Sequence, residues 1–184
     1  MKMLEINIPS QELYDEEKEC FSTQPGGTLV LEHSLLSLEK WEMKWKKPFL
    51  FSFERKQISQ EEFLDYIKCM TINKVNPKIY TMLTYENIQD IINYTNDSMT
   101  ATTINKRAKR SNRRDPIYTN EVIYAYMIEA GIPFECAKWH INRLLMLLQV
   151  CSELGNTSKK TKKELLQEYS SLNAARRAKL GTNG

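Results

Sequence analysis

The sequence contains few of the residues that interrupt regular structure. Only six glycines and six prolines occur among its 184 residues, which argues against both a sandwich with many short turns and a disordered chain. No run approaches the roughly 18 apolar residues of a membrane span, and the first ten residues, MKMLEINIPS, include no apolar signal segment. We therefore expect one main domain that is folded, mainly helical, soluble and unsecreted, with no membrane among its partners.

Sequence patterns that mark catalytic sites are missing as well. The chain has no Gly-rich phosphate loop, no G-x-S-x-G turn and no H-E-x-x-H pair. His33 lies beside Ser34, but adjacent residues at a strand-to-helix junction do not point at each other, so we interpret them as part of a helix cap. Cys136 and His140 are four residues apart, yet two ligands leave a tetrahedral zinc site incomplete. We expect no enzyme activity, no catalytic residue, no metal site and no cofactor.

The chain's cysteines are few and widely spaced. A disulfide framework would be unusual in a chain of this size without an export signal. At least three of them lie inside apolar helical patterns, where a thiol behaves as a small hydrophobic group. We interpret all of them as reduced and expect synthesis in the cytoplasm. The four are Cys20, Cys69, Cys136 and Cys151.

Strand periodicity is confined to the first 33 residues. Residues 3–8 alternate between apolar and polar side chains, and Pro9 ends this pattern. Residues 28–31 form a β-branched and aliphatic run after the turn residues Pro-Gly-Gly at 25–27. We expect residues 1–33 to form a small antiparallel β-meander that packs on one end of a helical core.

Helical periodicity defines a core over residues 34–155. Ser34 can cap a helix over 35–46, and Ser59 opens the capping-box sequence S-Q-E-E, in which Glu62 can reach back to the cap N–H. Capping residues also mark the starts of two further helical segments. These are Asn76-Pro77, for a short turn that ends at Met82, and Thr84, for a helix whose buried face is Ile88, Ile91 and Ile92.

The second half of this core is predicted to contain the most hydrophobic helix. Thr119 restarts the helical period, and Gly131 is expected to end that helix as its C-cap glycine. Pro133 then begins one continuous helix, which Gly155 ends. Burial of its wide apolar face, at about 25 cal/mol per Å², would place it at the centre of the core. That face consists of Phe134, Ala137, Ile141, Leu144, Leu145, Leu148 and Cys151.

Charge is distributed unevenly along the chain. Residues 105–115 carry six basic side chains and one acidic one, and residues 157–184 carry seven basic and two acidic ones. These two segments have a net charge of +10, whereas the remainder, with 13 basic and 20 acidic residues, has a net charge of −7. An acidic body with two basic appendages suits contact with a polyanion, with an acidic protein surface or with the body of a neighbouring copy.

Both basic segments fall where a wide apolar face is absent. Residues 96–118 are predicted to form a long basic loop, and residues 156–184 a basic C-terminal extension with an exposed helix over 164–180. We expect this extension to be disordered in isolation and to order on assembly. The loop could grip phosphates, or it could be a solvated or self-assembly loop, and the extension could bind nucleic acid or an acidic partner.

The candidate partner-binding residues combine these basic groups with two tryptophans. Trp41 and Trp45 are interleaved with lysines, which would suit stacking on single-stranded nucleic acid. Periodicity favours the core for Trp41, because Trp41 shares the side of Leu38, and leaves a partner-facing groove as the alternative. The candidate set is Trp41, Trp45, Lys106, Arg107, Lys109, Arg110, Arg113, Arg114, Arg176, Arg177 and Lys179.

Several stretches resemble small proteins encoded among the tail genes of long-tailed bacteriophages and prophages, the tail assembly chaperones. The resemblance covers nearly all of the chain from residue 31 onward. Asn183 departs from it, since a basic residue would be expected there. The stretches are EHSL (32–35), WEMKWKKPFL (41–50), YIKCMT (66–71), MTAT (99–102), IPFEC (132–136), KWHINRLL (138–145) and LNAARRAKLGT (172–182).

The resemblance implies a non-enzymatic protein that acts in the host bacterial cytoplasm during tail assembly. Such a chaperone would hold the long helical tape-measure protein in solution while tail-tube subunits gather along it, by covering apolar stripes through a groove. Two other functions stay open at this point. One is a virion structural component, such as a connector, cargo or minor capsid protein, and the other is direct nucleic-acid binding through the basic loop and tail. A homo-oligomer is a further expectation from the opposite charges.

Overall fold

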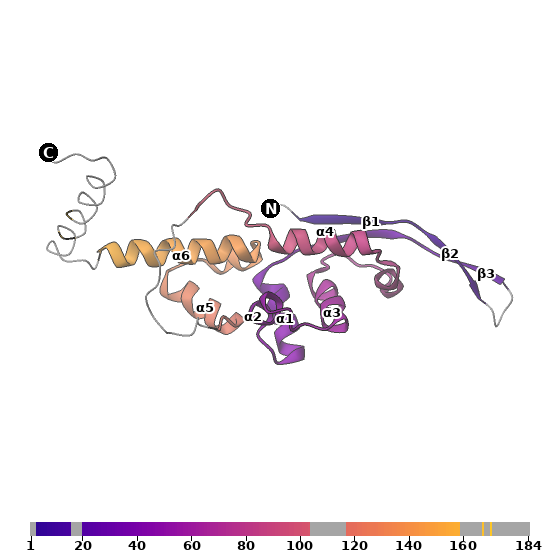
Figure 1. Ribbon diagram of the computed structural model, residues 1–184, viewed down its shortest axis with the longest axis horizontal. Helices are drawn as coiled ribbons and strands as arrows, with labels where there is room; N and C mark the ends of the chain where they lie inside the picture. The colour runs from indigo at the N-terminus through magenta and orange to yellow at the C-terminus, as the bar shows by residue number, and fades with distance from the viewer. Residues whose placement is uncertain (1–2, 16–19, 104–116, 159–166, 168–169, 171–184) are drawn as a thin grey trace, which may run out of the picture.

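The computed structural model describes residues 3–15, 20–103 and 117–158, together with residues 167 and 170. Over these residues the chain is mainly helical, with antiparallel strands at the N-terminal end (Figure 1). The expected fold class, mainly α with a small β element, is confirmed. Most of the predicted loop 96–118 and of the predicted extension 156–184 lies outside the described residues.

The strands form one long nested hairpin, not a meander. The inner ladder pairs β1 (Leu4–Ile8) with β4 (Gly27–Leu31), and the outer ladder pairs β2 (Gln11–Asp15) with β3 (Cys20–Gln24). The Pro-Gly pair at 25–26, interpreted above as part of a turn, lies instead at the joint between the two ladders. A Cβ on Gly26 would lie 2.2 Å from the carbonyl oxygen of Ile8, so this close approach requires glycine.

The inner ladder is anchored to the helical body along its β4 edge. The backbone N–H of Glu32 donates to the carbonyl of Met70 at 2.9 Å, and that of Ile72 donates to Val30 at 3.0 Å. One face of the ladder joins the core through Ile6, Ile8, Leu29 and Leu31, all of which are buried. The alternation read from the sequence therefore predicted the buried face correctly.

The helices follow in the order expected, with one addition. The capping box of Ser59 and Glu62 is present with both of its hydrogen bonds, and Thr84 and Asn87 form a second one. None of the described helices is long and apolar enough to cross a lipid bilayer. The elements are α1 (Leu35–Trp45), α2 (Phe49–Glu54), α3 (Gln60–Met70), η1 (Pro77–Met82), α4 (Tyr85–Asn96), α5 (Asn120–Glu129), η2 (Phe134–Lys138) and α6 (Ile141–Ser158), where η marks 3-10 helices.

The continuous helix predicted from Pro133 is broken. A 3-10 turn, η2, is followed by extended backbone at Trp139, and α6 begins only at Ile141. The break is caused by a long-range pairing, because the Ile141 N–H donates to the carbonyl of His33 at 2.9 Å and Ser34 bridges to His140. At its other end α6 continues through Gly155 to Ser158, so Gly155 is not the helix end.

The core is centred on α1 and not on α6 as predicted. Of the predicted α6 face, Ala137, Ile141 and Leu144 are buried, whereas Phe134 is 59% exposed. The rest of that face is half-buried, because α6 extends past the body of the molecule at one end, beside α5 (Figure 1). The largest fully buried side chains include Leu35, Leu38, Trp41, Phe49, Tyr66, Ile67, Met70, Ile91 and Ile123.

Glu42 links three helices through a buried carboxylate. From α1 it accepts the backbone N–H of Phe49 at the start of α2 and that of Asn120 at the start of α5, each at 2.8 Å. Burial raises the pKa of this carboxyl, while the two hydrogen bonds act to lower it. One acidic side chain therefore satisfies the orphan donors of two helix N-termini.

Replacing Glu42 with glutamine is expected to lower the free energy of unfolding by about 1–3 kcal/mol. The amide keeps one oxygen, so one of the two buried N–H groups would face the NH₂ group. Urea unfolding followed by circular dichroism measures the change. Glu129→Gln on the exposed end of α5 is the matched control and should shift stability by less than about 0.5 kcal/mol. Equal effects of the two substitutions would contradict the bridging role of Glu42.

Candidate partner-binding cleft

Nine of the eleven candidate residues proposed from the sequence lie outside the described residues. These belong to the basic loop and the C-terminal extension, so their role stays a prediction. The structure places the two tryptophans, which are both on α1. The nine are Lys106, Arg107, Lys109, Arg110, Arg113, Arg114, Arg176, Arg177 and Lys179.

Trp41 is a core residue and not a surface for a partner. Its side chain is 0% exposed, its indole N–H donates to the carbonyl of Glu62 at 2.8 Å, and its ring lies edge-on to Phe49 at 5.1 Å. The helical period had favoured this burial, which is confirmed. The partner-facing assignment of Trp41 is withdrawn, because a partner could reach it only if α1 and α3 separated.

Trp45 and the neighbouring lysines are engaged by acidic residues of α3. The Trp45 indole N–H donates to Asp65 at 3.0 Å, Lys44 pairs with the other oxygen of Asp65 at 2.7 Å, and Lys47 pairs with Glu62. Burial acts to raise the pKa of Asp65, but the hydrogen bonds from Lys44 and Trp45 outweigh it and hold that pKa below its usual value. The aromatic and basic residues of α1 thus serve to join α1 to α3.

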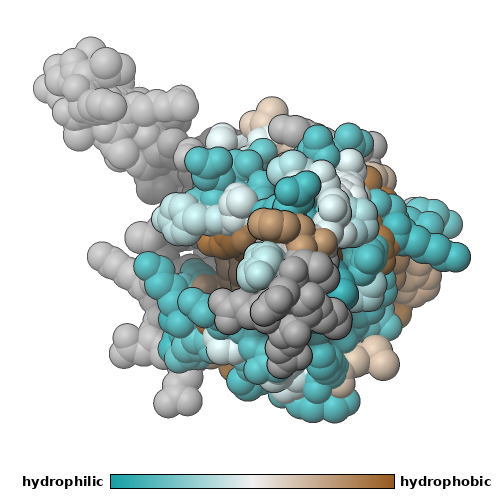
Figure 2. All heavy atoms as spheres, turned by 90° about the vertical axis from the view of Figure 1, so that its right-hand side faces the viewer, coloured by the Kyte–Doolittle hydropathy of each residue, from teal (hydrophilic) through white to brown (hydrophobic). Residues whose placement is uncertain are grey.

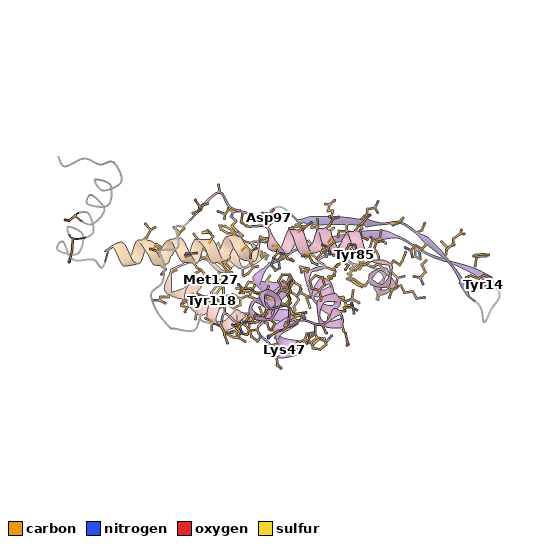
Figure 3. The ribbon with its side chains drawn as sticks, in the orientation of Figure 1. Tyr14, Lys47, Tyr85, Asp97, Tyr118 and Met127 are labelled. Atoms are coloured by element: carbon orange, nitrogen blue, oxygen red, sulfur yellow. The ribbon has the colours of Figure 1, made fainter. Side chains whose placement is uncertain are left out.

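Within the described residues, an apolar cleft of about 790 Å³ lies between four helices. Its walls come from α2 and the start of α3 on one side, and from the end of α4 and the start of α6 on the other. Tyr118, labelled in Figure 3 beside α5, contributes from the segment before that helix. The apolar lining residues are Phe49, Leu50, Phe53, Ile58, Phe63, Ile92 and Leu145.

One wall of the cleft is a row of stacked rings. Phe53 lies between Phe49 and Phe63, with ring centroids 5.5 Å and 6.0 Å away and the planes nearly parallel. Phe49 stacks in turn on Tyr66, so the row is fixed to the core. A rigid aromatic wall of this kind offers a large apolar contact area with little loss of side-chain entropy on binding.

The opposite rim carries a few fixed polar groups. The Asn142 side-chain amide on α6 donates to the carbonyl of Thr95 at 2.9 Å and to that of Asp97 at 2.8 Å. These bonds tie the start of α6 to the end of α4, where Asp97 is labelled in Figure 3. An apolar interior with a small number of oriented polar groups at its rim is the usual composition of a binding pocket.

His33 is among the residues that line the cleft and belongs to a buried cluster of four rings. Its Nδ1 lies 2.6 Å from the hydroxyl of Tyr66, and its ring lies edge-on to that of His140 at 4.8 Å. His140 donates from Nε2 to the carbonyl of Tyr94 at 3.0 Å, which leaves its buried Nδ1 without a hydrogen-bond partner. Burial lowers the pKa of both histidines, so both rings are neutral at pH 7.

Titratable side chains also contribute to the lining. The titratable members of the lining are His33, Glu54, Lys56 and Tyr118. The His33 ring contacts Tyr66 and His140, not the hydroxyl of Ser34, which lies 3.4 Å from that of Ser37. Among the described residues no group of three or more His, Cys, Asp or Glu side chains could hold a metal ion.

The cleft was not predicted from the sequence, although one signal for it is present there. The run FLFSF at residues 49–53 follows Pro48 and places three aromatic rings within five residues. Two of these rings, Phe49 and Phe53, are on the cleft wall. Comparison of the chain with protein-family models, with curated proteins and with solved structures gave no match.

Proposed function

We propose that this chain is a non-enzymatic binding protein that receives an apolar helical segment of a partner in the cleft, as a tail assembly chaperone for the phage tape-measure protein. The apolar cleft with its row of phenylalanine rings carries the proposal. The partner and the setting come from the resemblance of the stretches quoted above. The protein would act in the host bacterial cytoplasm, before the tail is complete.

The form of the cleft favours an amphipathic helix as its occupant. Helix-in-groove recognition places apolar side chains at i, i+3 and i+4 into an apolar groove, while polar groups stay at the rim. The walls formed by α2, α3, α4 and α6 supply that groove, and Asn142, Glu54 and Lys56 supply polar groups beside it. A tape measure is a long helical chain with apolar stripes, so it presents such segments repeatedly.

Removing one ring from the aromatic wall tests whether the cleft binds the partner. Phe53→Ser is expected to weaken binding of the co-expressed tape-measure protein at least about tenfold, because central aromatic contacts carry most of the binding energy of an interface. Leu50 also belongs to the lining, and Leu50→Gln should weaken binding as well. Affinity is measured by biolayer interferometry on the full-length chain, after circular dichroism has shown that each variant is folded.

The control removes an exposed aromatic ring elsewhere on the surface. Tyr85 is 78% exposed at the start of α4 and is absent from the cleft lining, so Tyr85→Ser should leave affinity unchanged. Mass spectrometry of purified mature particles tests the proposed role independently. A chaperone should be absent from them. Retention at a fixed copy number would overturn the chaperone role in favour of a structural component.

A further inference from the structure

Helix α5 has apolar side chains on every side. Its sequence, NEVIYAYMIE, is apolar without interruption from Val122 to Ile128, and a soluble helix of this kind is normally buried all round. Ile123 and Met127 are buried in the core, whereas Ile128 is 66% exposed. The described residues therefore leave one apolar side of α5 uncovered, and contiguous apolar patches on a folded domain mark sites of interaction.

The exposed side of α5 continues into the 3-10 helix η2. Phe134 in η2 is 59% exposed, and its ring centroid lies 6.0 Å from that of Tyr124 on α5. Tyr124 and Ile128 are about one helical turn apart, so these three side chains are neighbours. Figure 1 shows α5 at the end of the molecule away from the hairpin. We define the α5–η2 surface as these three side chains together with the exposed carboxylates of the same two elements, Glu121, Glu129 and Glu135.

Acidic side chains flank the apolar groups of this surface. Glu121, Ile128 and Glu129 recur at i, i+7 and i+8, a spacing that places them on one side of a helix, and all three are exposed. Glu135 is exposed in η2, where Lys138 is the basic residue. With three acidic residues and one basic residue, α5 and η2 together carry a net charge of −2.

The adjoining helix α1 adds negative charge beside Tyr124. The Tyr124 hydroxyl donates to the Glu39 carboxylate at 3.2 Å, and burial together with the charge of Glu39 raises the pKa of this tyrosine to about 12. Between described residues, the ion pairs involve Glu62 and Asp65 of α3, and none involves Glu39 or a carboxylate of the α5–η2 surface. The surface thus combines exposed apolar groups with carboxylates that no described lysine or arginine neutralises.

Charge complementarity selects the class of partner for this surface. Carboxylates around an apolar patch attract lysine and arginine and repel acidic groups, so they disfavour nucleic acid, an anionic lipid surface and an acidic protein segment. A second helix can cover the exposed side of α5, over a length of about 15 Å, by fitting its side-chain ridges into the grooves. We infer that the α5–η2 surface docks a helical segment of another protein, in which lysines and arginines flank an apolar stripe. None of the residues of this surface lines the cleft, so the inference does not depend on the function proposed above.

Fluorescence anisotropy of two labelled model peptides tests the inference on the full-length chain. One peptide repeats LKKLLKL, a basic amphipathic helix, and the other repeats LEELLEL, which keeps the apolar stripe and has acidic flanks. The chain is expected to bind the lysine peptide at least about tenfold more tightly than the glutamate peptide. Equal affinity for the two peptides would overturn the inference. Failure to bind the lysine peptide would overturn it as well, including the case in which a basic segment of the chain itself covers the surface.

Apolar variants locate the contact, with a matched control for each residue type. Ile128→Ser and Phe134→Ser should each weaken binding of the lysine peptide at least about tenfold. Ile72→Ser and Phe21→Ser make the same replacements at side chains that are 50% and 73% exposed, and they should leave binding unchanged. Phe21 belongs to the hairpin end, where Figure 2 shows apolar atoms among hydrophilic ones. If the control variants weaken binding as much as Ile128→Ser does, the peptide adheres to any exposed apolar group and the α5–η2 surface is not a docking site.

Charge variants test the acidic flanks. A variant with Glu121→Lys and Glu129→Lys changes the net charge of α5 and η2 from −2 to +2, because each replacement adds two charges. Once circular dichroism has shown that it is folded, this variant should bind the glutamate peptide more tightly than the lysine peptide. Glu86→Lys with Asp90→Lys makes the same change at exposed positions of α4 and should keep the original preference. An unaltered preference in the first variant would contradict the role of the carboxylates.

The cleft is the competing site for an amphipathic helix, and Phe53→Ser separates the two sites. The lysine peptide should still bind this variant, because Phe53 lines the cleft and lies outside the α5–η2 surface. If Phe53→Ser abolishes binding while Ile128→Ser has no effect, the peptide occupies the cleft. In that case the α5–η2 surface is not a docking site, whereas the function proposed for the cleft stands.

Discussion

Replacing Trp41 with alanine is expected to lower the free energy of unfolding by about 3–5 kcal/mol. The indole is fully buried between α1, α2 and α3, and its removal leaves a large cavity that the packed rings of Phe49 and Tyr66 cannot fill without moving. The carbonyl of Glu62 also loses its indole donor. Urea unfolding monitored by far-ultraviolet circular dichroism measures the change.

Trp45 provides a matched control one turn further along α1. It has the same side chain and also donates an indole N–H bond, but it is half-buried. Trp45→Ala should therefore cost less than half as much stability as Trp41→Ala. Trp41→Phe keeps a ring in the core and should fall between the two. An equal loss at both tryptophans would show that α1 is not packed on α3 through Trp41.

The parts of the fold that were predicted correctly depend on local sequence signals. Ser59 and Glu62 form their capping box, and Thr84 begins α4. Pro77 begins a short 3-10 helix that ends at Met82, as expected. Gly131 adopts the left-handed conformation with φ of +64°, as the C-cap prediction required. In each case the residues that determine the element lie within a few positions of one another.

The errors arose where distant residues decide the local structure. The helix predicted from Pro133 is broken at Trp139 because the following backbone pairs with His33 and Ser34, about a hundred residues earlier. Likewise, α2 was not predicted, and its first N–H is satisfied by Glu42 on the preceding helix. Helical periodicity carries no information about either partner.

The cleft was beyond sequence analysis for the same reason. Its lining comes from segments near residues 33, 50, 60, 95, 118 and 143, and only the folded chain brings these together. Trp41 and Trp45 were candidates because lysines lie beside both in the sequence. In the folded chain Trp41 faces the core, while the less conspicuous Phe53, stacked on the fully buried Phe49, contributes to the cleft wall.

Lowering the pH from 7.5 to 5.5 is expected to destabilise the protein through His33 and His140. These are the only two histidines in the chain, and both rings are buried within the cluster of Tyr66 and Tyr94. Burial lowers the pKa of each ring, and for His33 the neighbouring His140 lowers it further. The hydrogen bond to the carbonyl of Tyr94 and the charge of the nearby Asp97 act to raise the pKa of His140, but this pKa stays below its usual value.

The sign of the effect follows from proton linkage. In the unfolded chain a histidine takes up a proton below a pH of about 6.5, whereas in the folded state the same ring stays neutral to a lower pH. Stability is therefore complete above about 6.5 and falls as the pH decreases below it. Each histidine changes the free energy of unfolding by at most about 1.4 kcal/mol per pH unit, so the pair changes it by at most about 2.8 kcal/mol per pH unit.

The carboxyl groups with shifted pKa values affect stability in another pH range or with the opposite sign. The pKa values of Glu62 and Asp65 are lowered by their lysine partners and hydrogen bonds, so their titration falls below a pH of 4.5. Burial raises the pKa of Glu42, which would favour the folded state as the pH falls and thus has the opposite sign. Among the described groups with shifted pKa values, the histidine pair therefore accounts for a loss of stability between pH 7.5 and 5.5.

A double variant isolates the two rings. His33→Asn can replace the Nδ1 contact with Tyr66, and His140→Gln can keep a donor near the carbonyl of Tyr94, while neither side chain titrates. The double variant should be less stable at pH 7.5 because the packing of the rings is lost. Its stability should nevertheless change little between pH 7.5 and 5.5, since the groups that bind protons differently in the two states are gone. The change in the free energy of unfolding with pH is thus a separate readout from its value at pH 7.5. If the double variant showed the same change with pH as the unaltered chain, the buried histidines would not be its origin.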